Sequence, residues 1–329
     1  MAQRVQDFDK CPAALKGGVV AIGNFDGVHR GHQQVLWEAV DQGSRLSLRT
    51  NALTFEPHPR TVFRPAEPVF RLTPAPLKAR ILELMGFDAV FEQHFDRDFA
   101  SRSAENFVTD ILLGRLGVSH VVTGYDFHFG KGRQGDPDFL IEAGKRFGFG
   151  VSLVEAYGDE GGEVVSSSRI RDALATGDIG LANGLLGYRY AVAAEVLHGK
   201  KLGRSLGYPT ANMALPPETA LLPGIYAVRF RRADGSLHDG VASFGRRPTV
   251  DEDGAALLLE TFLFDFAGDL YGEHCTVSFV SRLRGEEKFD GLDQLVAQMK
   301  IDDAEARAVL GSLTPLSSLD AAMTFGPAA

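Results

Sequence analysis

The feature that most constrains the fold is a change in hydrophobic pattern near residue 183. Before it, short apolar runs alternate with longer segments of helical periodicity; after it, short apolar runs are separated by Gly, Pro and Asp turns. The first pattern predicts βαβ units and a Rossmann-like parallel sheet. The second predicts a small antiparallel β-barrel closed by a C-terminal helix. Because 329 residues exceed what one core usually supports, we expect two domains, 1–184 and 185–329.

The individual elements follow from the same patterns. In the first half the predicted strands are Val19–Ile22, Ala52–Phe55, Val118–Thr123 and Val151–Val154, and the predicted helices are Gln33–Gln42, Pro76–Met85, Ala104–Arg115, Phe139–Phe147 and one over Ser168–Ala175. In the second half the predicted strands are Tyr190–Val196, Gly224–Arg231, Asp239–Ser243, Leu257–Phe264 and Cys275–Phe279, followed by a helix at Leu292–Lys300. The last residues, Leu313–Ala329, are expected to form a loosely held tail.

Composition narrows the function classes. The 43 acidic and 34 basic residues give a net charge of −9, which argues against a broad nucleic-acid or anionic-membrane surface. The two cysteines, Cys11 and Cys275, are far apart and have no metal-ligand spacing, as in a cytosolic protein with free thiols. The N-terminus lacks the apolar segment of a secretory signal, and no run of 18 apolar residues occurs. We therefore expect a cytoplasmic protein without a membrane helix.

The first candidate site follows the strand Val19–Ile22. It has the sequence Gly23-Asn24-Phe25-Asp26-Gly27-Val28-His29-Arg30-Gly31-His32, and a helix comes next. A strand, a Gly-rich turn and a helix N-terminus form an anion site, because backbone N–H groups and the positive helix end face the ligand. His29 and His32 are three residues apart and can reach one spot at the helix mouth. As donors, they could stabilise charge that develops on a phosphate.

Three later segments carry further candidates. Thr54–Pro59 contains His58, and Gly124–Gly130 ends a strand, where α/β sheets place ligand loops. Ser166–Arg171 opens a helix, and its hydroxyls, amides and arginine suit a phosphate. Taken alone, the first is an ordinary Pro-rich turn and the last an ordinary helix N-cap.

Together these segments resemble the His-x-Gly-His nucleotidyltransferases, in the Gly-x-Phe-Asp-Gly form of bacterial FAD synthetases. The resemblance implies that His29 and His32 are catalytic. It also implies an ATP- and FMN-binding set made of Gly23, Asn24, Phe25, Asp26, Gly31, His58, Gly124, Asp126, Phe127, Ser167, Ser168 and Arg171. Tyr125 departs from the family pattern, which commonly has Glu there.

The second candidate site is the segment from His198 to Asn212, whose sequence is His-Gly-Lys-Lys-Leu-Gly-Arg-Ser-Leu-Gly-Tyr-Pro-Thr-Ala-Asn. It lacks the Gly-Lys-Thr spacing of a Walker loop, but its glycines allow a loop to wrap phosphates. Thr210 and Asn212 lie two residues apart on an extended segment and so share a face. Their oxygens are ligands of the kind that Mg²⁺ prefers together with substrate phosphates.

This segment resembles the Gly-Arg-x-Leu-Gly-x-Pro-Thr-Ala-Asn signature of riboflavin kinases. The resemblance implies that Glu260 is the base for the riboflavin 5′-hydroxyl and that Thr210 and Asn212 bind Mg²⁺. It further implies ATP- and flavin-binding by Gly199, Gly203, Arg204, Gly207, Pro209, Thr210 and Asn212. Ser243 stands where the family commonly has Asn.

Both patterns together cover about residues 17–310 and resemble the bacterial bifunctional riboflavin kinase/FAD synthetase family. The implied function is two-step FAD biosynthesis: ATP phosphorylates riboflavin to FMN, and ATP then adenylylates FMN to FAD and pyrophosphate. A nucleotidyltransferase with another acceptor is the alternative that the second module disfavours. A catalytically silent flavin-binding protein is a further alternative, which a turnover assay separates. Oligomeric state, flavin redox preference, relative rates and FMN channelling are left open.

Overall fold

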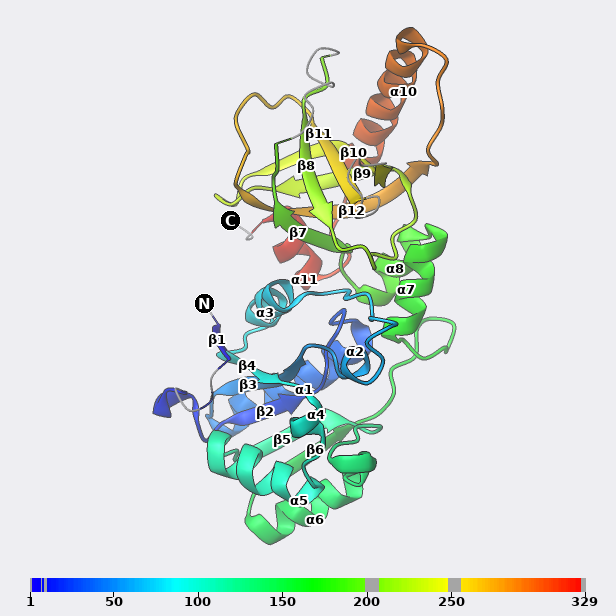
Figure 1. Ribbon diagram of the computed structural model, residues 1–329. Helices are drawn as coiled ribbons and strands as arrows, with labels where there is room; N and C mark the ends of the chain where they lie inside the picture. Colours follow the sequence, from blue (N-terminus) through cyan, green and yellow to red (C-terminus); the bar gives the residue numbers. More distant parts are fainter. Residues whose placement is uncertain (1, 7, 9–10, 199–206, 248–255, 327–329) are drawn as a thin grey trace. The chain divides into compact units, whose positions relative to one another are not determined.

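The computed structural model describes residues 2–6, 8, 11–198, 207–247 and 256–326 (Figure 1). The chain divides into two compact units, Met1–Ser166 and Ser167–Ala329. The first contains a parallel sheet with helices and the second an antiparallel barrel with helices, which confirms the predicted fold class. None of the helices in the described part of the chain combines the length and apolarity that crossing a bilayer requires.

The sheet of the first unit has the strand order β1-β4-β3-β2-β5-β6, and all of its pairs are parallel. Its strands are β1 (Gln3–Val5), β2 (Val19–Ile22), β3 (Thr50–Glu56), β4 (Ala89–His94), β5 (His120–Gly124) and β6 (Gly150–Val154). From β2 the chain first adds β3 and β4 on one side and later β5 and β6 on the other. The strand order therefore reverses between β2 and β5, and α/β sheets bind ligands in the crevice outside the carboxyl ends at such a point.

Helices enclose this sheet. They are η2 (Ala13–Leu15), α1 (Arg30–Leu46), α2 (Pro59–Phe63), α3 (Ala75–Leu84), α4 (Arg97–Ala100), α5 (Ala104–Asn106), the π-helix η3 (Phe107–Leu116), η4 (Lys131–Arg133) and α6 (Pro137–Phe147). On one face, side chains of η3 and α6 pack against Val20, Leu53 and Phe91 of the sheet. All four residues of β2 are buried, because the strand is covered on both faces.

The sheet of the second unit is antiparallel and nearly closed, with the order β7-β12-β9-β10-β11-β8. Its strands are β7 (Ala191–Glu195), β8 (Thr210–Leu215), β9 (Gly224–Arg231), β10 (Leu237–Arg247), β11 (Ala256–Leu263) and β12 (His274–Arg284). A bridge between Leu197 and Asn212 brings the two end strands together. Helix α10 (Leu292–Gly311) packs against β9, β10 and β12. Closure leaves few unpaired edges, as small barrels require.

Two helices, α7 (Ser167–Thr176) and α8 (Ile179–Leu186), precede the barrel and are bonded to it. The buried side chain of Asn183 donates from Nδ2 to the Phe279 carbonyl (3.0 Å) and accepts from the Tyr190 N–H (2.7 Å). The Leu222 N–H donates to the Leu174 carbonyl of α7 (3.0 Å). These bonds explain why both helices belong to the second unit. The predicted functional boundary between residues 184 and 185 stays a prediction.

The C-terminal segment differs from the loosely held tail that its composition predicted. It forms α11 (Ser318–Asp320) and η5 (Ala321–Phe325), and Leu319, Asp320 and Thr324 are buried. Asp320 accepts from the Arg189 guanidinium and N–H and from the Leu316 N–H (2.9 Å). The Asp320 carboxylate, with its several donors, therefore fixes this segment to Arg189 even though its composition is that of a linker. The prediction of a loosely held tail is wrong for residues 313–326.

Candidate active sites

The turn between β2 and α1 is held in an unusual backbone conformation. Phe25 and Val28 have positive φ angles of 46° and 38°, on either side of Gly27 at 88°. A positive φ is costly for a β-branched or bulky residue and typically persists at functional sites, at about 1–3 kcal/mol each. A Cβ on Gly23 would lie 2.9 Å from the Phe25 ring, so glycine is needed there. The strain lies where the sequence predicted the nucleotide loop.

The two histidines of the motif form a stacked pair at the start of α1. Their ring centroids are 3.6 Å apart with an interplanar angle of 17°. His29 is the N-cap of α1, and its Nδ1 accepts from the His32 N–H (3.2 Å). Because Nδ1 is an acceptor, the ring proton of His29 lies on Nε2. The structure thus brings the two predicted catalytic residues together, with the Nε2–H of His29 as a donor.

The surroundings of His32 keep its ring uncharged. Burial lowers the pKa of His32 well below 6.5, and electrostatic interactions with His29 and Lys78 lower it further. Its ring makes a T-shaped contact with the Phe25 ring at a centroid distance of 5.5 Å. Among the described residues, no group hydrogen-bonds to the buried Nδ1 of His32. A neutral imidazole at a helix mouth can donate one hydrogen bond to a phosphate without repelling neighbouring cations.

Asp26, predicted to bind ligand, holds the next loop in place. It is buried and accepts from the Thr73 N–H (3.1 Å) and the Leu72 N–H (3.3 Å), while the Gly27 N–H donates to Thr73 Oγ1 (2.8 Å). These bonds fasten the segment before α3 to the β2–α1 turn. They give Asp26 a structural role; a direct contact with nucleotide stays a prediction.

A largely buried group of charges, of which the motifs predicted only Asp26, lies at the carboxyl ends of β2 and β3. We call Asp26, Glu56, Arg71 and Lys78 the charge cluster. Arg71 donates to both oxygens of Glu56 (2.6 and 2.8 Å), and Lys78 Nζ lies 2.8 Å from Glu56 Oε1. Burial alone would raise the pKa of Glu56, but the hydrogen bonds from Arg71 and the charge of Lys78 lower it to about 2. Glu56 is therefore ionised at neutral pH.

The sequence did carry a signal for Lys78. It stands three and four residues before Ile81 and Leu82, on the apolar stripe of α3, where all three side chains are buried. A lysine on such a stripe must find buried acceptors or lose its charge. Burial lowers the pKa of the Lys78 ammonium, and the charge of Glu56 opposes that change.

The other predicted residues of the first unit lie at the same edge of the sheet. Gly124 ends β5, next to β2 across the switch point, and Asp126 and Tyr125 are exposed in the turn that follows. The Phe127 ring stacks on Phe129 at 5.4 Å. His58 is the N-cap of α2 and its Nδ1 accepts from the Arg60 N–H (3.2 Å). These positions fit ligand loops; their contacts with ATP or FMN stay predictions.

Ser167, Ser168 and Arg171 lie in the first half of α7, the first helix of the second unit. Ser168 is exposed, and Ser167 and Arg171 are half-buried. The opposite stripe of α7, Ile170 and Leu174, is buried. The positive end of this helix and the serine hydroxyls suit an anion, as the sequence predicted.

The candidate kinase residues form a row across the barrel. Asn212 on β8 is paired directly with Glu260 on β11, and Glu260 is paired with Ser243 on β10. Directly opposed residues in antiparallel strands project to the same face with Cβ atoms about 4.5–5.5 Å apart. Thr210, two residues before Asn212, shares that face. The cross-strand register therefore brings Thr210, Asn212 and Glu260 together, although 48 residues separate the last two.

Burial identifies this face as the outer one. The alternate residues Ala211, Met213, Leu259 and Thr261 are buried inside the barrel, whereas Glu260 and Thr210 of the row are half-buried and Asn212 is 7% exposed. Farther along the outer face, Val241 and Phe262 pack with Ala306 and Leu310 of α10. The helix thus borders the row of kinase residues. Tyr208 contacts Phe262 at a centroid distance of 4.8 Å, which holds the segment containing Gly207 and Pro209 beside the same row.

Three predicted kinase residues, Gly199, Gly203 and Arg204, lie outside the described residues. At the start of that segment, the His198 ring packs on the Tyr271 ring at 3.8 Å. Neither Tyr271 nor Tyr208 was predicted to have a role.

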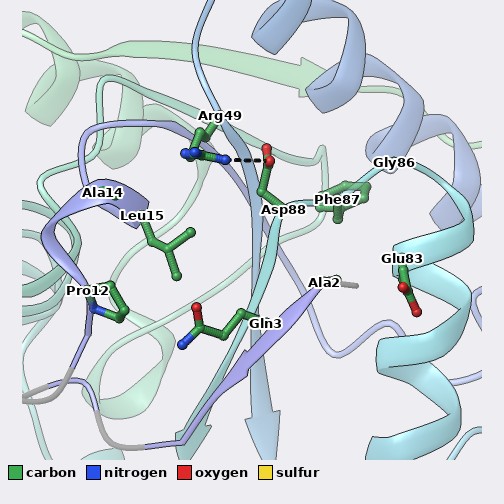
Figure 2. A pocket seen from close by; sticks show the side chains of 10 residues that line it. All are labelled: Ala2, Gln3, Pro12, Ala14, Leu15, Arg49, Glu83, Gly86, Phe87 and Asp88. Atoms are coloured by element: carbon green, nitrogen blue, oxygen red, sulfur yellow. Dashed lines mark hydrogen bonds and ion pairs between the residues drawn. The ribbon is translucent and has the colours of Figure 1, made fainter.

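A pocket of about 640 Å³ opens at the other edge of the first unit's sheet (Figure 2). Its lining includes Gln3, Arg49 and Asp88, which lie at or just before the amino ends of β1, β3 and β4. Arg49 pairs with Asp88 (2.8 Å), and Asp88 also accepts from the Thr50 N–H (2.9 Å), so this pair joins the starts of two strands. None of the predicted site residues lines this pocket.

Known protein families match the two parts of the chain separately. The FAD synthetase family model matches residues 11–169, and the riboflavin kinase family model matches residues 186–310. The chain is 40% identical over 303 residues to the bifunctional riboflavin kinase/FMN adenylyltransferase of Escherichia coli K12, covering 92% of this chain and 96% of that protein. The chain belongs to this bifunctional family.

Other relatives agree with this assignment. The Pseudomonas fluorescens bifunctional riboflavin kinase/FMN adenylyltransferase is 44% identical over 294 residues, covering 89% of this chain and 93% of the relative. A solved structure titled a macrolide-efflux protein from Streptococcus pneumoniae has a TM-score of 0.81 and 29% identity, covering 95% of this chain and 99% of that one. Residues 170–185 lie between the two segments that the family models match and are covered by neither model.

Proposed function

We propose that this chain makes FAD in two ATP-dependent steps. Residues 185–329 transfer the γ-phosphoryl group of ATP to the riboflavin 5′-hydroxyl, which gives FMN and ADP. Residues 1–184 let the FMN phosphate attack the α-phosphorus of a second ATP, which gives FAD and releases pyrophosphate. The observation that carries the proposal is the presence of both family patterns in one chain, each on the fold that its reaction needs.

For adenylyl transfer the protein needs no covalent nucleophile, because FMN supplies its own ionised phosphate. Catalysis then consists of positioning and of stabilising charge on the α-phosphate. The Nε2–H of His29, the neutral ring of His32 and the N-terminus of α1 supply donors at one place. Ser167, Ser168 and Arg171 act on the phosphates of ATP, as the family resemblance implies.

For phosphoryl transfer the half-buried Glu260 accepts the proton of the 5′-hydroxyl. Asn212 and Ser243 stand at its cross-strand positions, so all three residues lie on the same face of the sheet. Thr210 and Asn212 supply hydroxyl and amide oxygens, a donor set that fits Mg²⁺ when nucleotide phosphates complete its coordination. The bound ion would neutralise charge on those phosphates. Among the described residues no cluster of three or more His, Cys, Asp or Glu provides an alternative metal site.

The remaining expectations from composition, a cytoplasmic location and no nucleic-acid partner, stay predictions. ATP, riboflavin and FMN are the proposed ligands. The net charge of −9 supports a small-molecule enzyme over a nucleic-acid-binding protein.

The proposal is tested by chromatography of products from riboflavin, ATP and Mg²⁺, with Glu260→Gln as the informative variant. Glutamine keeps the shape of the side chain but cannot take a proton at neutral pH. We expect kinase turnover to fall by about 100-fold or more, with the KM for riboflavin nearly unchanged and adenylylation of added FMN unaffected.

The matched control is Glu195→Gln, which alters an exposed carboxylate on β7 of the same barrel. It should keep both activities. A Glu260→Gln enzyme whose kinase rate stays within a few-fold of wild type would show that Glu260 is not the base. Absence of FAD from FMN and ATP with folded wild-type protein would refute the adenylyltransferase half.

A further inference from the structure

Lys78 is a completely buried cation whose three ammonium donors are used within the first unit. Its Nζ donates to the Asn24 carbonyl (3.1 Å) and to Thr54 Oγ1 (2.6 Å), and it pairs with Glu56 Oε1 (2.8 Å). The Thr54 hydroxyl in turn donates to the same Asn24 carbonyl (3.2 Å). One side chain of α3 therefore ties the nucleotide loop after β2 to the end of β3.

The carbonyl that Lys78 holds belongs to the peptide bond before Phe25. The orientation of this peptide sets the φ angle of Phe25, which is positive at 46°. In that conformation the Phe25 ring lies close to Gly23 and makes a T-shaped contact with the His32 ring. A chain of contacts thus runs from Lys78 through Asn24 and Phe25 to the histidine pair.

Lys78 also contributes to the charge around His32. The charged or titratable groups that act on the His32 ring are His29, at the N-cap of α1, and Lys78, on α3. Behind Lys78 lie the two carboxylates and the guanidinium of the charge cluster, so the four charges sum to zero. Loss of the ammonium would leave Glu56 and Asp26 with only Arg71 as a partner cation in the cluster.

We propose that Lys78 is a positioning residue for adenylyl transfer: its ammonium holds the Asn24–Phe25 peptide in the strained conformation that places His32, and it keeps the surroundings of His32 from becoming negative. The proposal rests on the adenylyltransferase function proposed above. Lys78 bonds the Asn24 carbonyl directly and therefore acts on the histidine pair through Asn24 and Phe25.

The first test is Lys78→Met, which removes the ammonium and keeps the length of the side chain. We expect the kcat for FAD formation to fall by about 10- to 100-fold, as small misplacements of catalytic groups do, with KM values for FMN and ATP nearly unchanged. Kinase turnover in the same preparation should stay at the wild-type level. The matched control is Lys145→Met, which alters an exposed lysine on α6 and should keep both activities.

The second readout is the titration of His32 by NMR, with its signal assigned by its loss in His32→Gln. We expect Lys78→Met to raise the pKa of His32 by about one unit or more, because the remaining cluster is negative. The double variant Lys78→Met/Glu56→Gln removes both charges. It should return the pKa of His32 toward the wild-type value while turnover stays low, since the Asn24 carbonyl still lacks the Lys78 ammonium and keeps only the Thr54 hydroxyl as a donor.

A Lys78→Met enzyme with wild-type turnover and an unshifted His32 pKa overturns the proposal. If that variant does not fold, Thr54→Val decides, because it keeps the charge and removes the hydroxyl between Lys78 and Asn24. A loss of about fivefold or more in kcat for FAD supports the proposal, and a change of less than about twofold overturns it. Failure of the wild-type protein to make FAD would instead refute the proposed function itself.

Discussion

Loss of the Asn183 side chain should lower the stability of the second unit and leave that of the first unchanged. Its amide bonds the Tyr190 N–H (2.7 Å) and the Phe279 carbonyl (3.0 Å), and all three residues are buried. Asn183→Ala would leave one backbone donor and one backbone acceptor buried without these partners. Each such group costs about 1–3 kcal/mol, so we expect the free energy of unfolding to fall by about 2–6 kcal/mol. That is a large fraction of the stability of a typical domain.

The assay is urea unfolding of the full chain with two probes. The single tryptophan, Trp37, lies on α1, so its fluorescence reports on the first unit. Riboflavin kinase activity reports on the second. With a slope of about 2 kcal/mol per M of urea, the midpoint for kinase activity should fall by about 1–3 M. The Trp37 midpoint should not move.

The matched control is Gln294→Ala, which truncates an exposed amide on α10 and should change stability by less than about 0.5 kcal/mol. A midpoint shift for Asn183→Ala no larger than that of Gln294→Ala would refute the reasoning. An equal shift in both probes would also refute it, because it would show that Asn183 does not act on the second unit alone.

Three further predictions follow from the contacts. A fragment starting at Ser167 should be more stable to urea than one starting at Leu185, which lacks α7 and most of α8; equal midpoints would show that these helices add nothing to the barrel. His32→Ala and Arg171→Ala should each lower FAD formation by about 100- to 1,000-fold while FMN formation is unchanged; equal losses of both activities would indicate misfolding. The pKa of Glu56 is depressed to about 2, so its contribution to the stability of the first unit is complete above its unfolded pKa near 4.5 and is lost as pH falls toward 2. Glu56→Gln should therefore lower stability at pH 7 by about 3 kcal/mol and flatten the acid dependence measured by tryptophan fluorescence; an unchanged acid limb would contradict this.

Local patterns in the sequence were sufficient to predict most of the long helices and strands. The predicted strands Val19–Ile22 and Gly224–Arg231 coincide with β2 and β9. Their apolar pattern and the turn residues that bound them are visible within a few neighbouring residues of the chain. The short strand β1 and the mixed strand β4 (Ala89–His94) were not predicted. Each is too brief or too polar for its pattern to stand out, and each is defined by pairing with a neighbouring strand.

The candidate sites divide in the same way. The motif spacing by itself predicted that His29 and His32 meet at one helix start, because residues three apart lie on one side of a helix. It also predicted that Thr210 and Asn212 share a face, because alternate residues of a strand do. Only the tertiary structure decided that Asn212 lies opposite Glu260, because register between strands distant in sequence depends on the whole barrel.

Buried charges were decided by the tertiary structure as well. The partners of Lys78 lie 22 to 54 residues away, and the donors to Asp320 include Arg189, 131 residues away. In the sequence Asp320 belongs to a segment with the composition of a tail, and the place of Lys78 on an apolar helix stripe indicates its burial but not the groups that it meets. An ionised group can be buried only where oppositely charged or hydrogen-bonding groups converge on it. That convergence is a property of the folded chain, and no local pattern of residues encodes it.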